Sequence, residues 1–436
     1  MARRTLTPDG VLQALRELGA DSVVHVGFSG GADSLALLHA LSESRGAAPW
    51  ELRAVHVNHH LQDAADAWEE HCQRVCDALD LPLTVLHVYP AGDANLEARA
   101  RAARYQAWAE LLKPGEALVT AHHQDDQAET LLLRALRGSG VDGLAAIPAS
   151  RSLGAGRLLR PLLDVPRASL RHYVAEHGLH PVEDPSNACL ARDRNFLRHE
   201  ILPRLQQRWP DAVGVLARLA DAAAESRRLG RDLAGVDGLP DGPVLDCTRL
   251  WALPGRRRRN LVRAWLQSLS LPPPGRQRLV QGLHDLLHAE PDRRPELRWP
   301  GGRIRRYRES LYADDGIDPP PFTAPRPWRG EERLLLPSGV LHTRCSSGAG
   351  LRAGVISSGV MVGGYRPGEY CQPVGRPHRP VKKLLQEAGI PPWSREQWPR
   401  LRLHGEIIAI PGVCICENHA ADSGEPGLEL RYEPRD

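Results

Sequence analysis

Short apolar runs alternate with amphipathic segments between residues 20 and 200. The apolar runs, which predict strands, are Val23–Phe28, Leu52–Val57, Leu83–Val88 and Ala117–Ala121. The amphipathic segments, which predict helices, are Asp33–Ser44, Ala64–Leu79, Asn95–Leu112 and Asp125–Leu136. Strands separated by helices favour a parallel sheet with helices on both faces. We therefore expect an α/β domain whose ligands bind at the carboxyl ends of the strands.

The pattern changes after residue 200. A helical stretch, Arg198–Leu233, leads to a second region, Asp237–Asp315. The proline-rich stretch 318–327 has the composition of a semi-rigid linker. A third region, Leu334–Arg435, combines short strands with one predicted helix, Lys382–Ala388. We expect three domains: residues 1–205, residues 206–320 with the helical linker, and residues 330–436.

The composition is that of a globular protein, with 42% hydrophobic and 25% charged residues. At 436 residues the chain is longer than one typical core supports. It has no uncharged apolar run of about 18 residues, so no membrane span is expected. The N-terminus lacks the apolar core of a signal peptide, so we expect a cytoplasmic protein.

The eight cysteines form no recognisable metal or redox motif. Cys72 and Cys76 lie one helical turn apart, and one residue separates Cys414 from Cys416. Neither pair has the Cys-x-x-Cys spacing of many zinc, iron–sulfur and redox sites. We expect buried free thiols.

The loop after the first predicted strand has the composition of an anion site. Residues 26–34 have the sequence Val-Gly-Phe-Ser-Gly-Gly-Ala-Asp-Ser and lead directly into a helical pattern. Gly30 and Gly31 allow the backbone to approach phosphate oxygens. Ser29 and Ser34 add hydroxyl donors, and Asp33 can hold a Mg²⁺ ion that shields phosphate charge. The Gly-x-x-x-x-Gly-Lys-Ser/Thr loop is absent, so chemistry at the γ-phosphate is not indicated.

Two other polar segments follow predicted strands. If Thr120–Thr130 begins a helix, then His122, Asp126 (or Asp125) and Glu129 share one face. A histidine and carboxylates beside a nucleotide suit Mg²⁺ coordination and proton handling. Zinc is disfavoured because oxygen ligands outnumber nitrogen, and a solvated acidic helix start is the plain alternative. His56–Leu61 ends the second strand, where polar groups suit contacts to a base or ribose.

Arginines and aromatic residues share one face of the predicted helix 95–112. Arg101, Tyr105 and Trp108 fall along that face, which suits phosphate contact and base stacking. The alternative is an exposed helix stabilised by pairing between Glu97 and Arg101.

Lysine is rare in this chain, which has a net charge of +3. Lys382 and Lys383 are two of its three lysines, and Lys113 is the third. The adjacent pair begins a predicted helix, where positive charge opposes the helix dipole. A polyanionic partner would explain this placement.

The ordered series of motifs resembles the tRNA(Ile)-lysidine synthetase family. The Ser-Gly-Gly-x-Asp-Ser loop looks like the pyrophosphate loop of the N-type ATP pyrophosphatases. The matching elements of the first domain are Ser29–Ser34, His56–Leu61, Glu97–Tyr105, His122–Thr130, Arg137–Gly140, Arg160–Leu163, Glu183–Asn187 and Arg194–Arg198. In the third region, Arg366–Glu369 and Arg379–Trp393 also resemble the family, whereas the middle region matches only loosely. The chain departs from the family at His60, where a glycine is usual.

The resemblance implies a fold and a reaction. The fold is an adenine nucleotide α-hydrolase-like (PP-loop) domain with a helical linker and two smaller C-terminal domains. ATP adenylates the C2 oxygen of the wobble cytidine in the CAU anticodon of tRNA(Ile), and the ε-amine of free L-lysine then replaces AMP. The product, lysidine, changes decoding from AUG to AUA. The implied cofactors are ATP and Mg²⁺, with no membrane partner, and a homodimer is one assembly that the sequence allows.

The resemblance also implies roles for individual residues. The expected nucleotide-binding residues are Ser29, Gly30, Gly31, Ala32, Asp33, Ser34, His56 and Asn58. The expected catalytic residues are Asp33, which also holds Mg²⁺, and His122, Asp126 and Glu129. His123 is an alternative to His122. The expected substrate-binding residues are Arg99, Arg104, Arg137, Arg194, Asn195, Lys382 and Lys383.

Three other functions compete with this one. A tRNA thiolase with the same ATP loop would need a nucleophilic cysteine or Cys-x-x-Cys ligands, which the first domain lacks. A small-molecule amidating ligase would not need the basic C-terminal regions. A non-enzymatic RNA-binding protein would not need the intact Ser-Gly-Gly-x-Asp-Ser loop.

Overall fold

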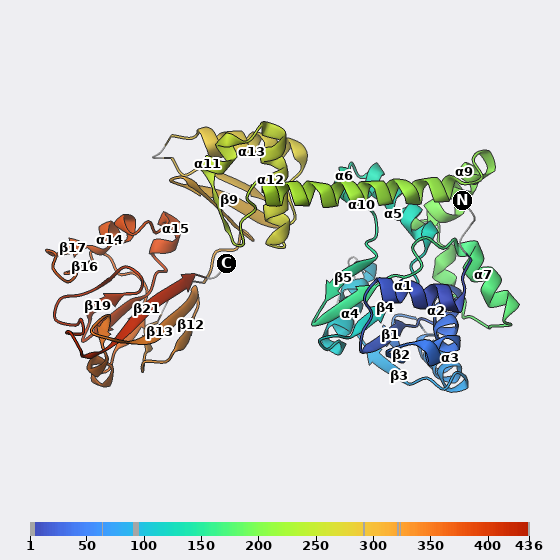
Figure 1. Cartoon of the computed structure of the whole chain (residues 1–436), viewed down its shortest axis with the longest axis horizontal. Coiled ribbons are helices and arrows are strands. Elements are labelled where there is room, and N and C mark those ends of the chain that lie inside the picture. Colours follow the sequence, from blue (N-terminus) through green and yellow to red (C-terminus); the bar gives the residue numbers. More distant parts are fainter. Residues whose placement is uncertain are drawn as a thin grey trace. The chain divides into compact units, whose positions relative to one another are not determined.

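The computed structural model describes residues 5–62, 64–89, 96–290, 293–320, 322 and 324–434. The chain forms two compact units, residues 1–229 and residues 230–436, which are considered separately (Figure 1). The predicted helix start at Asn95 and the predicted domain end at Arg435 lie outside the described residues.

A six-stranded sheet forms the centre of the first unit, in the order β3-β2-β1-β4-β6-β5. Its strands are β1 (Val23–Gly27), β2 (Glu51–Asn58), β3 (Leu83–His87), β4 (Ala117–Val119), β5 (Ser150–Leu153) and β6 (Gly156–Leu159). All neighbouring strands are parallel except the β5–β6 pair. The four predicted strands and the parallel α/β fold are therefore confirmed. The short β5–β6 hairpin extends the sheet beyond the prediction.

Helices cover both faces of this sheet. The α-helices between residues 8 and 208 are α1 (Pro8–Glu17), α2 (Ala32–Glu43), α3 (Ala65–Ala78), α4 (Leu96–Leu111), α5 (Gln124–Leu136), α6 (Val141–Leu144), α7 (Arg167–Glu176), α8 (Asp193–Phe196) and α9 (Leu202–Arg208). Side chains from α1, α2, α3 and α7 form the core on one face of the sheet. Leu38 of α2 and Val119 of β4 belong to this core. Trp108 of α4 and Leu118 of β4 belong to the core on the other face. Adjacent residues of β4 thus point into opposite cores, as expected for a strand buried on both faces.

The second unit contains two hydrophobic cores. The long helix α10 (Ala212–Val236) crosses from the first unit into the second. A four-stranded antiparallel sheet follows, made of β7 (Val244–Asp246), β8 (Glu296–Trp299), β9 (Gly302–Tyr307) and β10 (Ser310–Asp314). It shares a core with α11 (Cys247–Ala252), α12 (Gly255–Ser268) and α13 (Arg276–His288).

The last hundred residues pack around a separate core. One sheet contains β11 (Arg326–Pro327), β15 (Met361–Gly363), β18 (Arg400–Leu403), β19 (Glu406–Ile410) and β20 (Cys414–Ile415). Another contains β12 (Arg333–Leu336), β13 (Gly339–Ser347), β14 (Leu351–Arg352) and β21 (Pro426–Pro434), and a third pairs β16 (Tyr370–Cys371) with β17 (Arg379–Pro380). The predicted helix at 382–388 is α14 (Val381–Glu387), which α15 (Pro392–Arg395) follows. The two cores of the second unit support the three-domain division, which remains a proposal.

No helix among the described residues has the length and apolar character needed to cross a membrane.

Candidate active site

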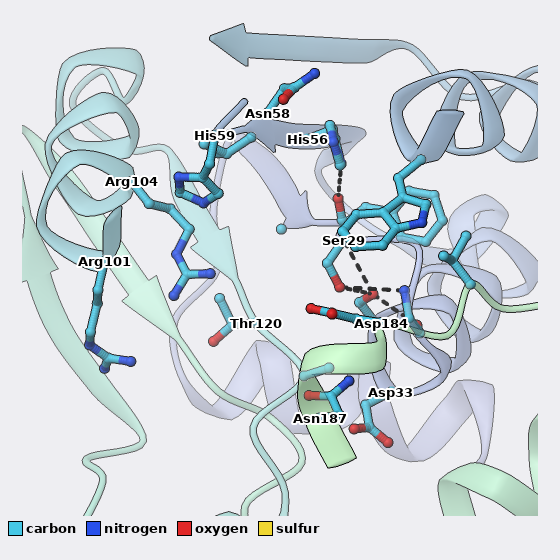
Figure 2. A pocket seen from close by; sticks show the side chains of 18 of the residues that line it. Ser29, Asp33, His56, Asn58, His59, Arg101, Arg104, Thr120, Asp184 and Asn187 are labelled. Carbon is cyan, nitrogen blue, oxygen red and sulfur yellow. Dashed lines mark hydrogen bonds between the residues drawn. The ribbon is translucent and has the colours of Figure 1, made fainter. Parts of the chain in front are cut away.

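A cavity of about 580 Å³ lies where the strands β1, β2 and β4 end. Its walls come from the β1–α2 loop, the end of β2, α4, the β4–α5 loop and the segment 182–198 (Figure 2). The structure thus brings together the three polar segments that the sequence places after predicted strands. Parallel sheets bind ligands at this edge because their strands all end there.

Hydrogen bonds to serine hydroxyls stabilise the conformation of the β1–α2 loop. The Ser29 amide donates to Ser34 Oγ at 3.2 Å, and Ser34 Oγ donates to the Gly31 carbonyl at 3.0 Å. Gly30 has φ +81°, and a Cβ there would lie 3.3 Å from Cys72 Sγ, so the position favours glycine. The first amides of α2 follow this loop, and the first N–H groups of a helix have no partner within the helix. Backbone donors at a helix start therefore adjoin the cavity, which Ser29, Gly31, Asp33 and Ser34 line, whereas Gly30 and Ala32 do not.

The two carboxylate oxygens of Asp33 differ: one contacts other side chains, and the other is open, meaning that it has no hydrogen-bond partner among the described residues. Oδ2 lies 3.5 Å from His123 Nε2 and 3.8 Å from Arg167 Nε. Oδ1 is buried and has no hydrogen-bond partner among the described residues. Burial alone would raise the pKa of Asp33, but the hydrogen bond and charge of His123 hold it below its ordinary value. An ionised carboxylate with an open oxygen fits a divalent cation such as Mg²⁺.

His123 begins α5 and positions Asp33. It is 1% exposed, and its Nδ1 accepts from the Asp126 amide at 3.4 Å, which leaves Nε2 to face Asp33. Burial alone would lower the pKa of His123, but Asp33 and Asp126 raise it above its ordinary value. His123 is therefore an internal partner of Asp33 and lies outside the cavity lining.

His122 does line the cavity, and it stays neutral. Its Nδ1 lies 2.8 Å from Thr120 Oγ1. Burial lowers the pKa of His122 to about 3, although Asp126 opposes the shift. A ring with this pKa carries no charge near neutral pH and can still form hydrogen bonds.

Asp126 and Glu129 form ion pairs with two arginines, Arg194 and Arg198. Arg194 contacts Asp126 Oδ1 and Glu129 Oε2, each at 2.6 Å. Arg198 Nε donates to Glu129 Oε1 at 2.6 Å. Burial alone would raise the pKa of Asp126, but His123 and Arg194 lower it to about 2. Glu129 is fully buried and does not line the cavity, whereas Asp126, Arg194 and Arg198 do.

The end of β2 is organised by its own polar side chains. His56 Nδ1 donates to the Phe28 carbonyl at 2.9 Å, which joins β2 to the end of β1. Asn58 Nδ2 donates to Asp66 at 3.1 Å and Glu69 at 2.8 Å, and its Oδ1 accepts from the His60 amide. Both His56 and Asn58 line the cavity, but the amide of Asn58 is committed to contacts within the protein.

The backbone at His60 is left-handed, with φ +50°, a conformation that favours glycine. In this chain the His60 ring stacks on His87 and Tyr89, with ring centroids 5.1 and 4.8 Å apart. His59 instead lines the cavity beside Arg104 (Figure 2). Burial, helped by the charge of Arg104, lowers the pKa of His59 to about 4.

The expected substrate-binding residues separate into two groups. Arg104 lines the cavity and lies over the Trp108 ring, 5.2 Å from its centroid, and Arg101 lies over Tyr105 at 5.1 Å. Arg194 and Asn195 also line the cavity, and Asn195 donates to the Cys189 carbonyl. The remaining ones do not line it: Arg99 is exposed, Arg137 pairs with Asp193 at 3.2 Å, and Lys382 and Lys383 are exposed on α14 of the second unit. The Glu97 side chain lies outside the description, so its pairing with Arg101 stays a prediction.

Several cavity residues were not among the expected ones. Asp184 and Asn187 belong to a loop whose sequence, Glu-Asp-Pro-Ser-Asn, predicts only a turn, and they face the cavity in Figure 2. Arg192 comes from the same segment. In the sequence, these residues are marked only by a cluster of turn residues close to a charged helix start. Such clusters are common on protein surfaces and do not by themselves indicate a site.

Three family models match the chain. They describe a PP-loop domain at residues 9–205, a TilS substrate binding domain at 245–312 and a TilS substrate C-terminal domain at 360–432. A solved structure, the U34-tRNA thiolase NcsA from Methanococcus maripaludis with its [4Fe-4S] cluster, is 20% identical with a TM-score of 0.42. That similarity covers 50% of this chain and 78% of the other.

Two curated relatives are similar over nearly the whole chain. The tRNA(Ile)-lysidine synthase of Alkalilimnicola ehrlichii is 48% identical, covering 96% of this chain and 99% of the relative. That of Coxiella burnetii is 38% identical, covering 98% and 97%. The PP-loop match covers the domain that contains the cavity, and the relatives match over nearly their whole length. The chain therefore belongs to the tRNA(Ile)-lysidine synthase family of ligases.

Proposed function

We propose that this chain joins free L-lysine to the wobble cytidine of tRNA(Ile) with a CAU anticodon, by way of an adenylated C2 oxygen. The observation that carries the proposal is the cavity of the first unit. The cavity is lined by the Ser29–Ser34 loop and by several arginines, and by Asp33, whose Oδ1 has no hydrogen-bond partner among the described residues. The relatives are tRNA(Ile)-lysidine synthases, which supports lysine and tRNA(Ile) as the substrates.

The first half of the proposed reaction activates a poor leaving group. The C2 oxygen of cytidine attacks the α-phosphorus of ATP, and pyrophosphate leaves. The backbone amides at the start of α2 would bind pyrophosphate, because they present donors and the positive end of the helix dipole. Asp33 would hold Mg²⁺, which supplies charge neutralisation for the phosphates when it is bound.

The second half replaces AMP by an amine. The ε-amine of lysine attacks C2, AMP leaves with the former C2 oxygen, and the amine nitrogen loses protons. The amine must be neutral when it attacks. Because the pKa of His122 is about 3, His122 is a poor proton acceptor near neutral pH, and we assign it a hydrogen-bonding role.

Asp126 and Glu129 act through the arginines in this proposal. Their contacts fix Arg194 and Arg198, whose side chains line the cavity. A guanidinium held in this way suits a phosphate or the lysine carboxylate. We therefore assign Glu129 as a positioning residue and keep Asp126, which borders the cavity, among the catalytic candidates.

The thiolase alternative finds no support in the cavity. A sulfur-transferring enzyme needs a reactive thiol or cluster ligands there. Of the described residues that line the cavity, none is a cysteine. Cys72 and Cys76 lie in the adjoining core, and burial raises the pKa of each thiol to about 12.

A lysine-transfer assay tests the proposal. The full chain is incubated with ATP, Mg²⁺, labelled lysine and a tRNA(Ile) transcript with a CAU anticodon, and a transcript with U at the wobble position is the control. We expect label in the CAU transcript only, with AMP and pyrophosphate as products and little ATP turnover without tRNA. ADP and orthophosphate as main products, or no lysine in the RNA, would contradict the proposal.

A further inference from the structure

Three cysteines of the second unit meet in space although they are distant in sequence. Cys371 belongs to β16, Cys414 to β20, and Cys416 lies just beyond β20. Their sulfur atoms all lie within 4.8 Å of one another, and Cys371 Sγ is 3.9 Å from Cys414 Sγ. Among the described residues this is the one group of three or more ligating side chains so arranged. All three thiols are free; Cys371 and Cys416 are buried and Cys414 is half-buried.

Backbone hydrogen bonds fix this arrangement. The Val374 amide donates to the Ile415 carbonyl at 3.1 Å, and the Glu417 amide donates to the Gln372 carbonyl at 2.7 Å. The Cys416 amide donates to Ile408 of β19 at 2.9 Å. The segment after Cys371 therefore pairs with the segment around Cys416, so the three thiols converge through the fold of the chain.

We propose that Cys371, Cys414 and Cys416 form a thiolate site for a soft metal ion, with Zn²⁺ as the ion that fits best. Zinc binds cysteine sulfur at about 2.3 Å, so neighbouring sulfurs of a tetrahedral site lie roughly 3.8 Å apart. The 3.9 Å between Cys371 and Cys414 agrees with that edge. A disulfide would need its sulfurs at about 2.05 Å, and all three cysteines are free.

The group also has the chemistry of a thiolate site. Sulfur ligands select zinc and other soft ions over Mg²⁺. His378 lies in the exposed loop that follows Cys371 and is our candidate for the fourth ligand.

The ion would act structurally. It would tie the β16–β17 segment to β20, and β17 leads directly into α14 (Figure 1). Lys382 and Lys383 stand on that helix, so the site would order a basic surface. That last step rests on the proposed tRNA function, whereas metal binding itself does not.

Metal binding is measured on the reduced full-length chain. The chain is stripped with a chelator and titrated with Co²⁺, whose absorption reports tetrahedral thiolate ligation, and Zn²⁺ is then added in competition. We expect about one metal ion per chain, an intense sulfur-to-metal charge-transfer band, and a higher melting temperature with Zn²⁺. A reduced wild-type chain that binds neither ion would overturn the proposal.

Variants separate the cluster from incidental thiols. Cys414→Ser should weaken Co²⁺ binding at least tenfold and remove most of the charge-transfer band. Cys345→Ser, an exposed cysteine of the same unit, should leave both unchanged. Equal metal binding by both variants would refute the site. Because Cys414 is half-buried, His378→Ala provides a second test at an exposed position: it should shift the Co²⁺ spectrum, and an unchanged spectrum would remove His378 from the ligand set.

Discussion

Each unit contains carboxylates that pair with two arginines, and two of these sites, at Glu129 and at Glu387, differ in burial. Glu129 of the first unit is 0% exposed and lies 2.6 Å from both Arg194 and Arg198. Glu387 of the second unit is 40% exposed and pairs with Arg379 at 2.7 Å and Arg376 at 3.5 Å.

The difference indicates what each set of arginines can do. Glu129 itself is buried, so it holds both arginines in one geometry beside the cavity, and its loss would leave Asp126 as their remaining charged partner. Around Glu387 water screens the pair, so a phosphate group can replace the carboxylate at little cost. We infer that the buried site serves chemistry and the exposed site serves reversible binding of RNA.

The largest expected effect comes from removing the carboxylate of Asp33, whose Oδ1 has no hydrogen-bond partner among the described residues. Asp33→Ala removes the carboxylate proposed to hold Mg²⁺, so formation of AMP should slow by about 10²–10³-fold, or roughly 3–4 kcal/mol. The rate of AMP release with tRNA present measures it. Asp9→Ala is the control, because Asp9 is an exposed acidic residue in the first turn of α1. A near-normal rate in Asp33→Ala would remove Asp33 from the mechanism.

The second effect compares the two carboxylates directly. Glu129→Gln should destabilise the first unit by about 3 kcal/mol, because Arg194 and Arg198 lose a buried charged partner and keep Asp126. Glu387→Gln should cost at most about 1 kcal/mol, because its pairs are exposed. Hydrogen exchange of the α5 and α14 amides reports each region separately.

The same pair of variants also separates their effects on function. Glu129→Gln should lower the rate of lysine transfer, whereas Glu387→Gln should strengthen tRNA binding because it frees Arg376 and Arg379. Similar stability losses in both variants would show that burial does not distinguish the two sites.

The third effect concerns the exposed lysines beside Glu387. Lys382→Ala combined with Lys383→Ala should weaken tRNA binding and lower the log–log salt slope by about one to two. ATP affinity of the free protein should not change, since its proposed site lies in the first unit. Lys113→Ala removes the third lysine and should leave the slope unaltered. An unchanged slope in the double variant would identify the pair as an ordinary solvated surface.

The smallest effect is a dependence of stability on pH. The pKa of His122 falls from 6.5 to about 3 in the folded protein, so the unfolded chain binds the proton more tightly. Stability from this group is complete above about pH 6.5 and decreases as the pH falls toward 3. Between pH 7 and pH 5, His122→Gln should therefore lose about 1–2 kcal/mol less stability than the parent chain. Urea unfolding at the two pH values tests this, and equal losses would contradict the shifted pKa.

Much of the fold could be predicted because its signals are local. The four predicted strands and the Ser29–Ser34 turn carry their periodicity and composition within a few residues. The β5–β6 hairpin escaped prediction because its strands are four residues long and β5 is largely polar. Its order in the sheet depends on contacts between distant segments, which periodicity does not report.

The position of the cavity could be predicted from the sequence, but the contacts between its side chains could not. Parallel topology alone brings His56, His122 and Asp33 to one edge. The sequence could not show that Asp126 and Glu129 are occupied by Arg194 and Arg198, because that depends on residues about 70 positions apart meeting in space. The cluster of Cys371 with Cys414 and Cys416 was missed for the same reason.

The most direct test of the account follows the α-phosphate of ATP in a single turnover without lysine. With α-³²P-labelled ATP and the CAU transcript, we predict label on the RNA as AMP and its release as free AMP when lysine is added. Asp33→Ala should give no labelled RNA. Label that remains in ATP, appears in ADP or is attached to the protein would contradict adenylation of cytidine in this cavity.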